Sequence, residues 1–152
     1  MCNFATEGFV SVMAIADMLG GPAVLRREVR SELDLAELIH AGLPTRVVDV
    51  VLKSGLLLAG ELYALVVPRR TLAHRKEKQK TLSSDQSDRL ARVVRVTWRA
   101  REALGDAEKA ARWLRKENRA LGGKRPIDLL ESDVGARLVE RILGRIEHGV
   151  YS

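Results

Sequence analysis

The strongest constraint on the fold of this chain is the spacing of its apolar residues, which recur every three or four positions in one segment after another. The clearest repeat lies near the C-terminus and fits one face of a helix: Val134, Leu138, Val139, Ile142, Leu143 and Ile146. No segment alternates apolar and polar residues for long enough to indicate a strand. Aromatic residues make up only 4% of the chain, so its core has to be built from Leu, Val, Ile and Ala. We therefore expect an all-α fold.

Residues with helix-capping side chains divide the chain into segments. Four of them precede apolar runs and are positioned to accept a hydrogen bond from the first turn of a helix: Ser31, Ser83, Asp106 and Ser132. Gln86 follows Ser83 at the spacing of a reciprocal capping box. Gly149 suits the C-terminal end of a helix. The segment after Asp106 has a face of small residues, which predicts that it lies at the centre of a helical bundle.

A short basic segment carries most of the net charge. The chain has 26 Lys and Arg against 20 Asp and Glu, a net charge of +6. Residues 69–80 contain six of these cations and one anion, which leaves +5 in this segment. Leu72 is its only large apolar residue, so one side is anchored and the rest is left for solvent or a ligand. A helix with charge of one sign that follows a short helix and a tight turn predicts DNA contact, although such a helix can also be merely a solvated surface.

The predicted DNA contacts differ along this segment. The full set is Arg69, Arg70, Thr71, His74, Arg75, Lys76 and Lys78. The first three lie at the start of the segment, the end of a recognition helix that usually meets base edges. The lysines are expected at phosphates, where charge alone is sufficient. Because one basic helix binds weakly, we expect the DNA-binding form to be a dimer or larger.

The rest of the composition excludes several kinds of site. Cys2 is the only cysteine, which rules out a disulfide framework and a thiolate zinc cluster. His40, His74 and His148 are far apart in the sequence and lack metal-binding spacing. No nucleophile, base and third group recur in a catalytic pattern, so we expect a non-enzyme without cofactor or metal. The first cation is Arg26 and no apolar run reaches the roughly 18–20 residues of a membrane span, so we expect a cytoplasmic protein.

Two groups of motifs resemble one known family. The motifs of the C-terminal half are Ala110-Ala111-Arg112-Trp113-Leu114, Asn118, Gly122-Gly123, Pro126-Ile127-Asp128-Leu129-Leu130 and Arg145-Ile146-Glu147-His148-Gly149-Val150-Tyr151. They resemble the toxin-binding domain of the Xre/MbcA/ParS antitoxins. Residues 68–76 and 82–90 are similar to the Xre-like helix-turn-helix half of the same antitoxins, although Val66 stands where the turn commonly has glycine. We therefore expect an N-terminal arm or short helix at 1–30, a helix-turn-helix domain at 31–82 and a toxin-binding domain at 83–152.

The resemblance also implies a function. Antitoxins of this family are encoded beside a RES-domain toxin, an enzyme that consumes NAD, and they neutralise it by direct binding and often repress their own operon. The implied partners are the cognate RES-domain toxin and operator DNA, in a homodimer or a larger hetero-oligomer with the toxin. The alternative is a stand-alone helix-turn-helix transcriptional regulator whose C-terminal half only dimerises.

We expect the C-terminal tail to neutralise the toxin by blocking its active site. The predicted toxin-binding set is Trp113, Asn118, Arg145, His148, Gly149, Val150, Tyr151 and Ser152. Gly149 lets the chain leave the helix axis, and Tyr151 is suited to anchor the tail. Arg145 and His148 can hold phosphates in an NAD-consuming site. The alternative is that these two residues only complement the negative end of their helix, and that Trp113 only packs against the next helix.

Overall fold

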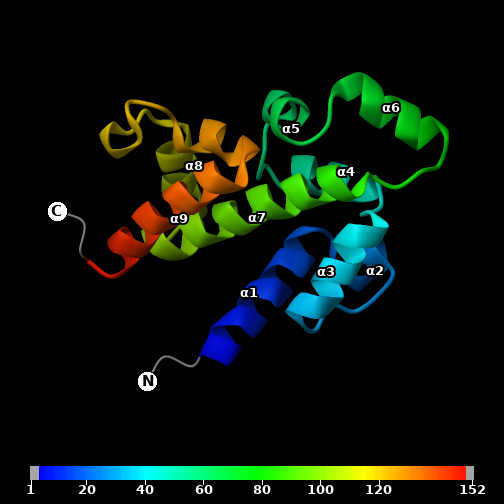
Figure 1. Ribbon diagram of the computed structural model, residues 1–152, viewed down its shortest axis with the longest axis horizontal. Coiled ribbons are helices and arrows are strands. Elements are labelled where there is room, and N and C mark those ends of the chain that lie inside the picture. The colour runs from blue at the N-terminus through cyan, green and yellow to red at the C-terminus, as the bar shows by residue number, and fades with distance from the viewer. Residues whose placement is uncertain (1–3, 150–152) are drawn as a thin grey trace. The chain divides into compact units, whose positions relative to one another are not determined.

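The computed structural model describes residues 4–149, with side chains from residue 11 onward. All regular structure in this range is helical, and the one β-type pairing found there is an isolated bridge between Asn118 and Lys124 (Figure 1). The prediction of an all-α fold is confirmed. The chain packs as two units, of which the first ends at Ala91 and the second begins at Arg92. Because α7 (Ser84–Leu104) runs through this boundary, each unit contains part of it.

The first unit contains α1 to α6 and the start of α7. The bounds of these helices are α1 (Phe4–Met18), α2 (Gly21–Leu25), α3 (Glu32–Ala41), α4 (Arg46–Lys53), α5 (Ala59–Leu65) and α6 (Arg69–Glu77). α1 packs against both α2 and α3. The core is aliphatic, and its most completely buried side chains include Leu19, Leu43, Val47, Val48, Leu62 and Leu90.

A buried serine fixes the start of α7 within this unit. Ser87 is fully buried, and its Oγ accepts a hydrogen bond of 2.8 Å from the backbone N–H of Leu43. The backbone N–H of Leu82 donates to the carbonyl oxygen of Leu43 at 2.9 Å. Both backbone groups of Leu43 are thus satisfied by the segment that leads into α7, as buried polar groups require.

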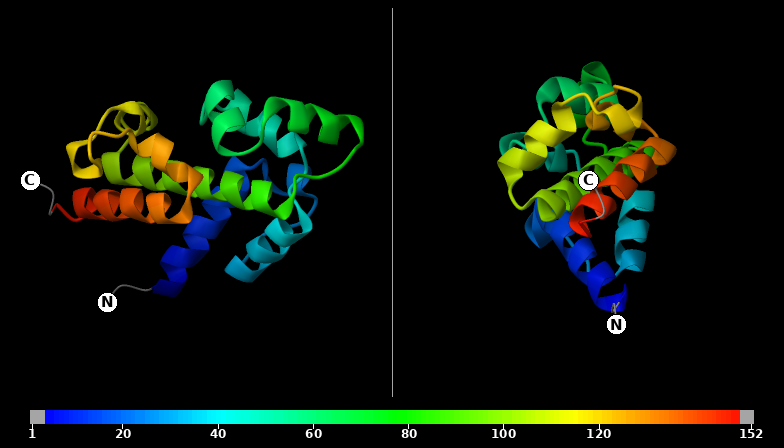
Figure 2. Two further views of the ribbon diagram at one scale, coloured as in Figure 1. Left: turned by 45° about the horizontal axis from the view of Figure 1, so that its top comes forward. Right: turned by 90° about the vertical axis from the view of Figure 1, so that its left-hand side faces the viewer.

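The second unit is built on the remainder of α7. It adds α8 (Ala107–Arg115), the 3-10 helices η1 (Arg119–Leu121) and η2 (Pro126–Glu131), and α9 (Asp133–Glu147). α8 and α9 both pack against η2, and Figure 2 shows α9 running alongside the second part of α7. α8 fully buries only Ala110 and Leu114, so it covers the unit from one side. The prediction that this helix lies at the centre was wrong.

The four predicted helix caps are confirmed. In each, a side-chain oxygen accepts a hydrogen bond from the backbone N–H three residues later, at 3.1 Å for Ser31, 3.1 Å for Ser83, 2.7 Å for Asp106 and 3.0 Å for Ser132. The capping box is complete, because Gln86 Oε1 accepts from the Ser83 N–H at 2.9 Å. Gly149 follows the end of α9 with a φ of +68°, a conformation that glycine adopts without strain.

The apolar stripe predicted for α9 is wrong at its N-terminal end. Val134 is 69% exposed and Leu138 is 39% exposed, whereas Gly135 and Ala136 are buried beside Val139, Ile142 and Leu143. The reason is a close approach of α9 to η2. A Cβ atom at Gly135 would lie 2.0 Å from the carbonyl oxygen of Leu129, so only glycine permits this contact. The smallest residues therefore face the neighbouring element, and two large apolar residues face outward.

Within residues 4–149, no helix has both the length and the apolar character required to cross a membrane.

Candidate functional site

The helices α5 and α6 form a helix-turn-helix. α5 begins where the backbone N–H of Leu58 donates to Glu61 Oε1 at 2.9 Å, and it ends at Leu65. The turn consists of Val66, Val67 and Pro68, and its two valines are buried. Because α6 starts directly after Pro68, the turn sets the direction of the basic helix.

The turn is closed without glycine. Val66 has a φ of −114°, which a β-branched residue adopts readily. The backbone N–H groups of Val66 and Val67 both donate to the carbonyl oxygen of Leu62, at 2.9 and 3.3 Å. The different closure expected from Val66 thus consists of two hydrogen bonds to one carbonyl and burial of the two valine side chains.

Leu72 attaches α6 to the first unit. It is 5% exposed, as expected for the only large apolar residue of the segment. Thr71 and Arg75 lie towards the same side and are half-buried, and the Arg75 guanidinium donates to the carbonyl oxygen of Thr81 at 2.8 Å. Two members of the predicted DNA-binding set therefore also contribute to the packing of α6 and the loop that follows it.

The opposite side of α6 is open. Arg70, Ala73, His74 and Glu77 are exposed and follow one another at helical spacing, with Arg69 exposed at the start of the helix. Ala73 and Glu77 were missed in the sequence analysis, which considered cations alone. The spacing from Arg70 would have found them, because residues three and seven positions further on share its face.

Lys76 lies beside an acidic residue of a different helix. Its Nζ is 2.8 Å from Oδ1 of Asp49 on α4, and both side chains remain partly exposed. This ion pair draws one predicted phosphate contact towards α4. No local sequence signal indicates the pair, because 27 residues separate its members. Lys78 caps the C-terminal end of α6 and is exposed.

The predicted toxin-binding residues are dispersed over the second unit. Trp113 on α8 is half-buried, and Asn118 caps η1, its Oδ1 accepting from the Ala120 N–H at 2.9 Å. Arg145 and His148 are exposed at the end of α9, next to the exposed Gly149. Val150, Tyr151 and Ser152 lie outside the described residues.

An exposed stripe on α9 links the two misassigned apolar residues to the predicted cations. We call it the α9 stripe; its members follow one another four, three, four and three residues apart and are Val134, Leu138, Arg141, Arg145 and His148. On another side of α9, Glu140 Oε1 lies 2.7 Å from Arg95 Nε, and Glu147 Oε2 lies 3.6 Å from Arg99 Nη2. The glutamates of α9 are thus engaged with α7, and the α9 stripe presents only apolar and cationic side chains.

Among the described residues, no three His, Cys, Asp or Glu side chains come together as metal ligands would.

Two family models match the chain. The Antitoxin Xre-like helix-turn-helix domain matches residues 34–95, and the Antitoxin Xre/MbcA/ParS C-terminal toxin-binding domain matches residues 99–149. An Antitoxin Xre of Photorhabdus laumondii is 32% identical over 120 residues, which cover 78% of this chain and 81% of the relative. The chain belongs to the Xre/MbcA/ParS family of antitoxins.

Two further relatives agree with this family. An Antitoxin Xre of Yersinia enterocolitica is 35% identical over 120 residues, covering 78% of this chain and 81% of the relative. An Antitoxin Xre of Pseudomonas putida is 38% identical over 84 residues, covering 55% of this chain and 53% of the relative. All three are named as antitoxins and not as enzymes. The helix-turn-helix match contains α5 and α6, and the toxin-binding match contains α8 and α9, whereas residues 1–33 lie outside both.

Proposed function

We propose that this member of the antitoxin family binds a cognate RES-domain, NAD-consuming toxin through its second unit and operator DNA through α6. The observation that carries the proposal is that each unit has its own family match and its own exposed cationic helix face. The chain acts by binding and not as an enzyme. By holding the toxin and repressing its own operon, it couples the amount of antitoxin to the amount of toxin.

For DNA, the proposal rests on the open side of α6. Arg70 and His74 are one turn apart, near the start of the helix, where a recognition helix meets base edges in the major groove. Ala73 lies between them in register, and its small side chain permits a close approach to the groove. Arg69 and Lys78 lie at the two ends of α6, where their charge favours phosphate contacts.

Two copies of α6 are required for a full operator. One helix of nine residues reads only a half-site, so a dimer should contact two half-sites about 34 Å apart, or a multiple of this distance. The α6 prediction is tested by gel-shift titration with the promoter region upstream of the chain's own gene. Arg70→Ala with His74→Ala should lower the affinity by about tenfold or more. Arg112→Ala, which removes an exposed cation from α8, is the matched control; equal losses in both variants would contradict the assignment to α6.

For the toxin, the proposal rests on the α9 stripe and the tail that follows it. The apolar end of the stripe, Val134 and Leu138, offers surface that gains from burial in an interface. Its cationic end, Arg145 and His148, leads directly into residues 149–152. An NAD-consuming active site has to bind phosphates, and cationic side chains at its mouth compete for the same groups. We therefore assign the stripe to docking and the tail to blockage of the active site.

Co-expression with the toxin tests this assignment. The full chain should restore growth, and deletion of residues 149–152 should abolish the rescue while helicity and DNA affinity stay unchanged. Arg145→Ala should weaken rescue less than the deletion does. Arg137→Ala is the control, because Arg137 is exposed on α9 beside the stripe and pairs locally with Asp133 at 2.8 Å. Full protection by the truncated chain would reject the tail and favour a blocking surface around Trp113 and Asn118.

The alternative function, a stand-alone regulator whose C-terminal half only dimerises, has one observation in its favour. Val134 and Leu138 form an exposed apolar pair, and such a pair can also meet a second copy of the chain. Co-purification with the product of the adjacent gene separates the two functions. A stable complex supports the antitoxin, whereas an isolated oligomer and unchanged toxicity support the regulator.

A further inference from the structure

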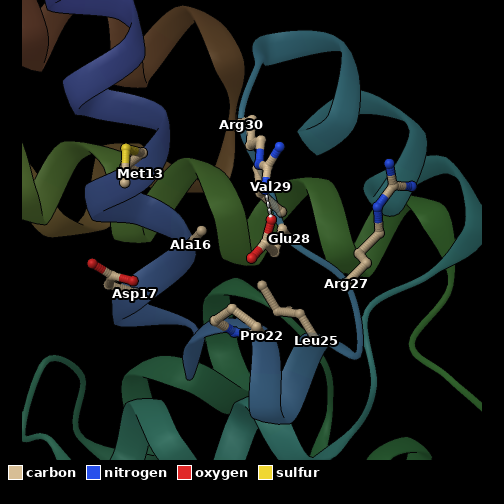
Figure 3. Close-up of a pocket in the computed structure, with 9 residues that line it drawn as sticks. All are labelled: Met13, Ala16, Asp17, Pro22, Leu25, Arg27, Glu28, Val29 and Arg30. Atoms are coloured by element: carbon tan, nitrogen blue, oxygen red, sulfur yellow. Dashed lines mark hydrogen bonds and ion pairs between the residues drawn. The ribbon is translucent and has the colours of Figure 1, made fainter.

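A groove in the first unit lies outside the helix-turn-helix and toxin-binding matches. It has a volume of about 200 Å³, and its walls are α1 and the segment 26–30 that leads to α3 (Figure 3). Its lining is largely apolar, with Met13 and Ala16 from α1, Leu25 from α2 and Val29 from the segment. Pro22 at the start of α2 closes one end in the same view. The groove is therefore a shallow apolar site with charged residues at its edge.

The wall opposite α1 is held in place by hydrogen bonds. Asp34 Oδ2 accepts from the backbone N–H of Arg30 at 2.9 Å, and Asp34 Oδ1 lies 3.3 Å from Arg27 Nη2. The Arg30 N–H holds the pKa of the Asp34 carboxyl below its ordinary value, and the Arg27 charge acts in the same direction. Arg30 also pairs with Glu28. These contacts fix the groove before any partner arrives.

The apolar surface of this region extends beyond the groove. The sequence of α1, Phe4–Met18, is apolar in all helical directions, and its only charged residues are Glu7 and Asp17. A helix of this kind is normally covered on all sides in water. Yet Met13 is 43% exposed, and Leu33 in the first turn of α3 is 67% exposed. Part of the first unit thus has the composition of an interior but lies at the surface.

The charge of the region selects its partner. Residues 1–25 contain two acidic residues and no cation, so their charge is −2 within a chain whose net charge is +6. Residues 26–30 contain three arginines against one glutamate. A second copy can therefore place its uncharged or acidic α1 against this arginine-bearing wall without repulsion. The toxin is the less suitable occupant, because the toxin-binding match begins only at residue 99.

We propose that the groove and the adjoining face of α1 form the homodimer interface, with α1 of each chain lying against the groove of the other. This arrangement is a twofold, self-complementary contact, in which the same residues serve on both sides. It rests on the proposed function in one respect: operator reading through α6 is incomplete with a single copy. The groove thereby supplies the second half of the DNA-binding site.

The test is the mass of the full chain in solution. Sedimentation equilibrium should give a dimer for the unmodified chain, and Met13→Glu with Leu33→Glu should raise the dimer dissociation constant by more than about tenfold, because the new carboxylates would be buried in the interface. Val134→Glu is the matched control, an exposed apolar residue of the second unit changed in the same way. Circular dichroism verifies that each variant retains its helicity.

Three results would overturn the proposal. They are an unmodified chain that stays monomeric at all concentrations, a Met13/Leu33 variant that dimerises normally, and a Val134 variant that becomes monomeric while the Met13/Leu33 variant does not. A promoter titration separates this inference from the proposed function. If the chain dimerises through α1 but binds no DNA, the interface stands and the operator proposal fails. If it binds DNA, the Met13/Leu33 variant should retain half-site affinity and lose the additional affinity for two half-sites.

Discussion

Replacing Gly135 by alanine should destabilise the protein, although the same change stabilises most helices. In the middle of a helix, alanine is favoured over glycine by about 1 kcal/mol. At Gly135, however, the added Cβ would lie 2.0 Å from the Leu129 carbonyl oxygen and 2.9 Å from its carbon. Ordinary van der Waals contact begins at 3.4 Å, so α9 and η2 would have to separate by more than 1 Å. The backbone of η2 cannot rotate away as a side chain can.

The net effect follows from the two opposing terms. Overpacking of this kind costs about 1–3 kcal/mol and more where backbone has to move, which exceeds the gain in helix propensity. We expect the free energy of unfolding to fall by about 2 kcal/mol, equivalent to a decrease in Tm of about 4–8 °C for a chain of this size. Urea denaturation of the full chain, followed by circular dichroism, measures both quantities.

Gly144 provides the matched control on the same helix. The nearest atom to a Cβ at this position is Arg99 Nη2, 3.8 Å away at the end of a flexible side chain. Gly144→Ala should therefore stabilise the protein by up to about 1 kcal/mol. If Gly135→Ala is as stable as the unmodified chain, the close approach does not determine how α9 packs, and our explanation for the exposure of Val134 and Leu138 is refuted.

Three further predictions concern the first unit. Asp49→Asn should strengthen promoter binding by about two- to fivefold and steepen its salt dependence, because Lys76 is released to the phosphates; weaker binding in a gel-shift titration would contradict this. Ser87→Ala should lower the free energy of unfolding by about 1–3 kcal/mol in urea, since a buried backbone N–H loses its acceptor, and an unchanged midpoint would contradict this. The Asp34 pKa is lowered by the Arg30 N–H, so its stabilising contribution is present above the ordinary value of 3.8 and is lost as the pH falls through the lowered pKa; an NMR titration of Asp34 that gives 3.8 or higher would refute this.

The features that the sequence predicted well are local ones. Ser83 and Gln86 form their capping box within four residues, and Leu72 is recognisable as an anchor because its segment has no other large apolar residue. Such signals depend on chain spacing alone, which the sequence contains in full. The same is true of the motifs that identified the antitoxin family, since they are short runs of consecutive residues.

The features that the sequence did not predict depend on contacts between distant segments. The helical period around Val134 fits two neighbouring faces of α9, and only the approach of Leu129 to Gly135 decides which of them is buried. Likewise, Lys76 belongs to a segment of one charge sign in the sequence, but the packing of α4 brings Asp49 to it. In both cases the deciding atom lies on another element, where no periodicity argument reaches.

The glycine-free turn between α5 and α6 has a consequence for the thermodynamics of DNA recognition. Valine explores fewer backbone and side-chain conformations than glycine in the unfolded chain, so less entropy is lost when the turn forms. The buried side chains of Val66 and Val67 and the shared Leu62 carbonyl then hold α6 in one orientation before DNA is present. Association with an operator should consequently require little ordering of the turn, and its heat-capacity change should reflect the buried contact surface with no large contribution from coupled folding.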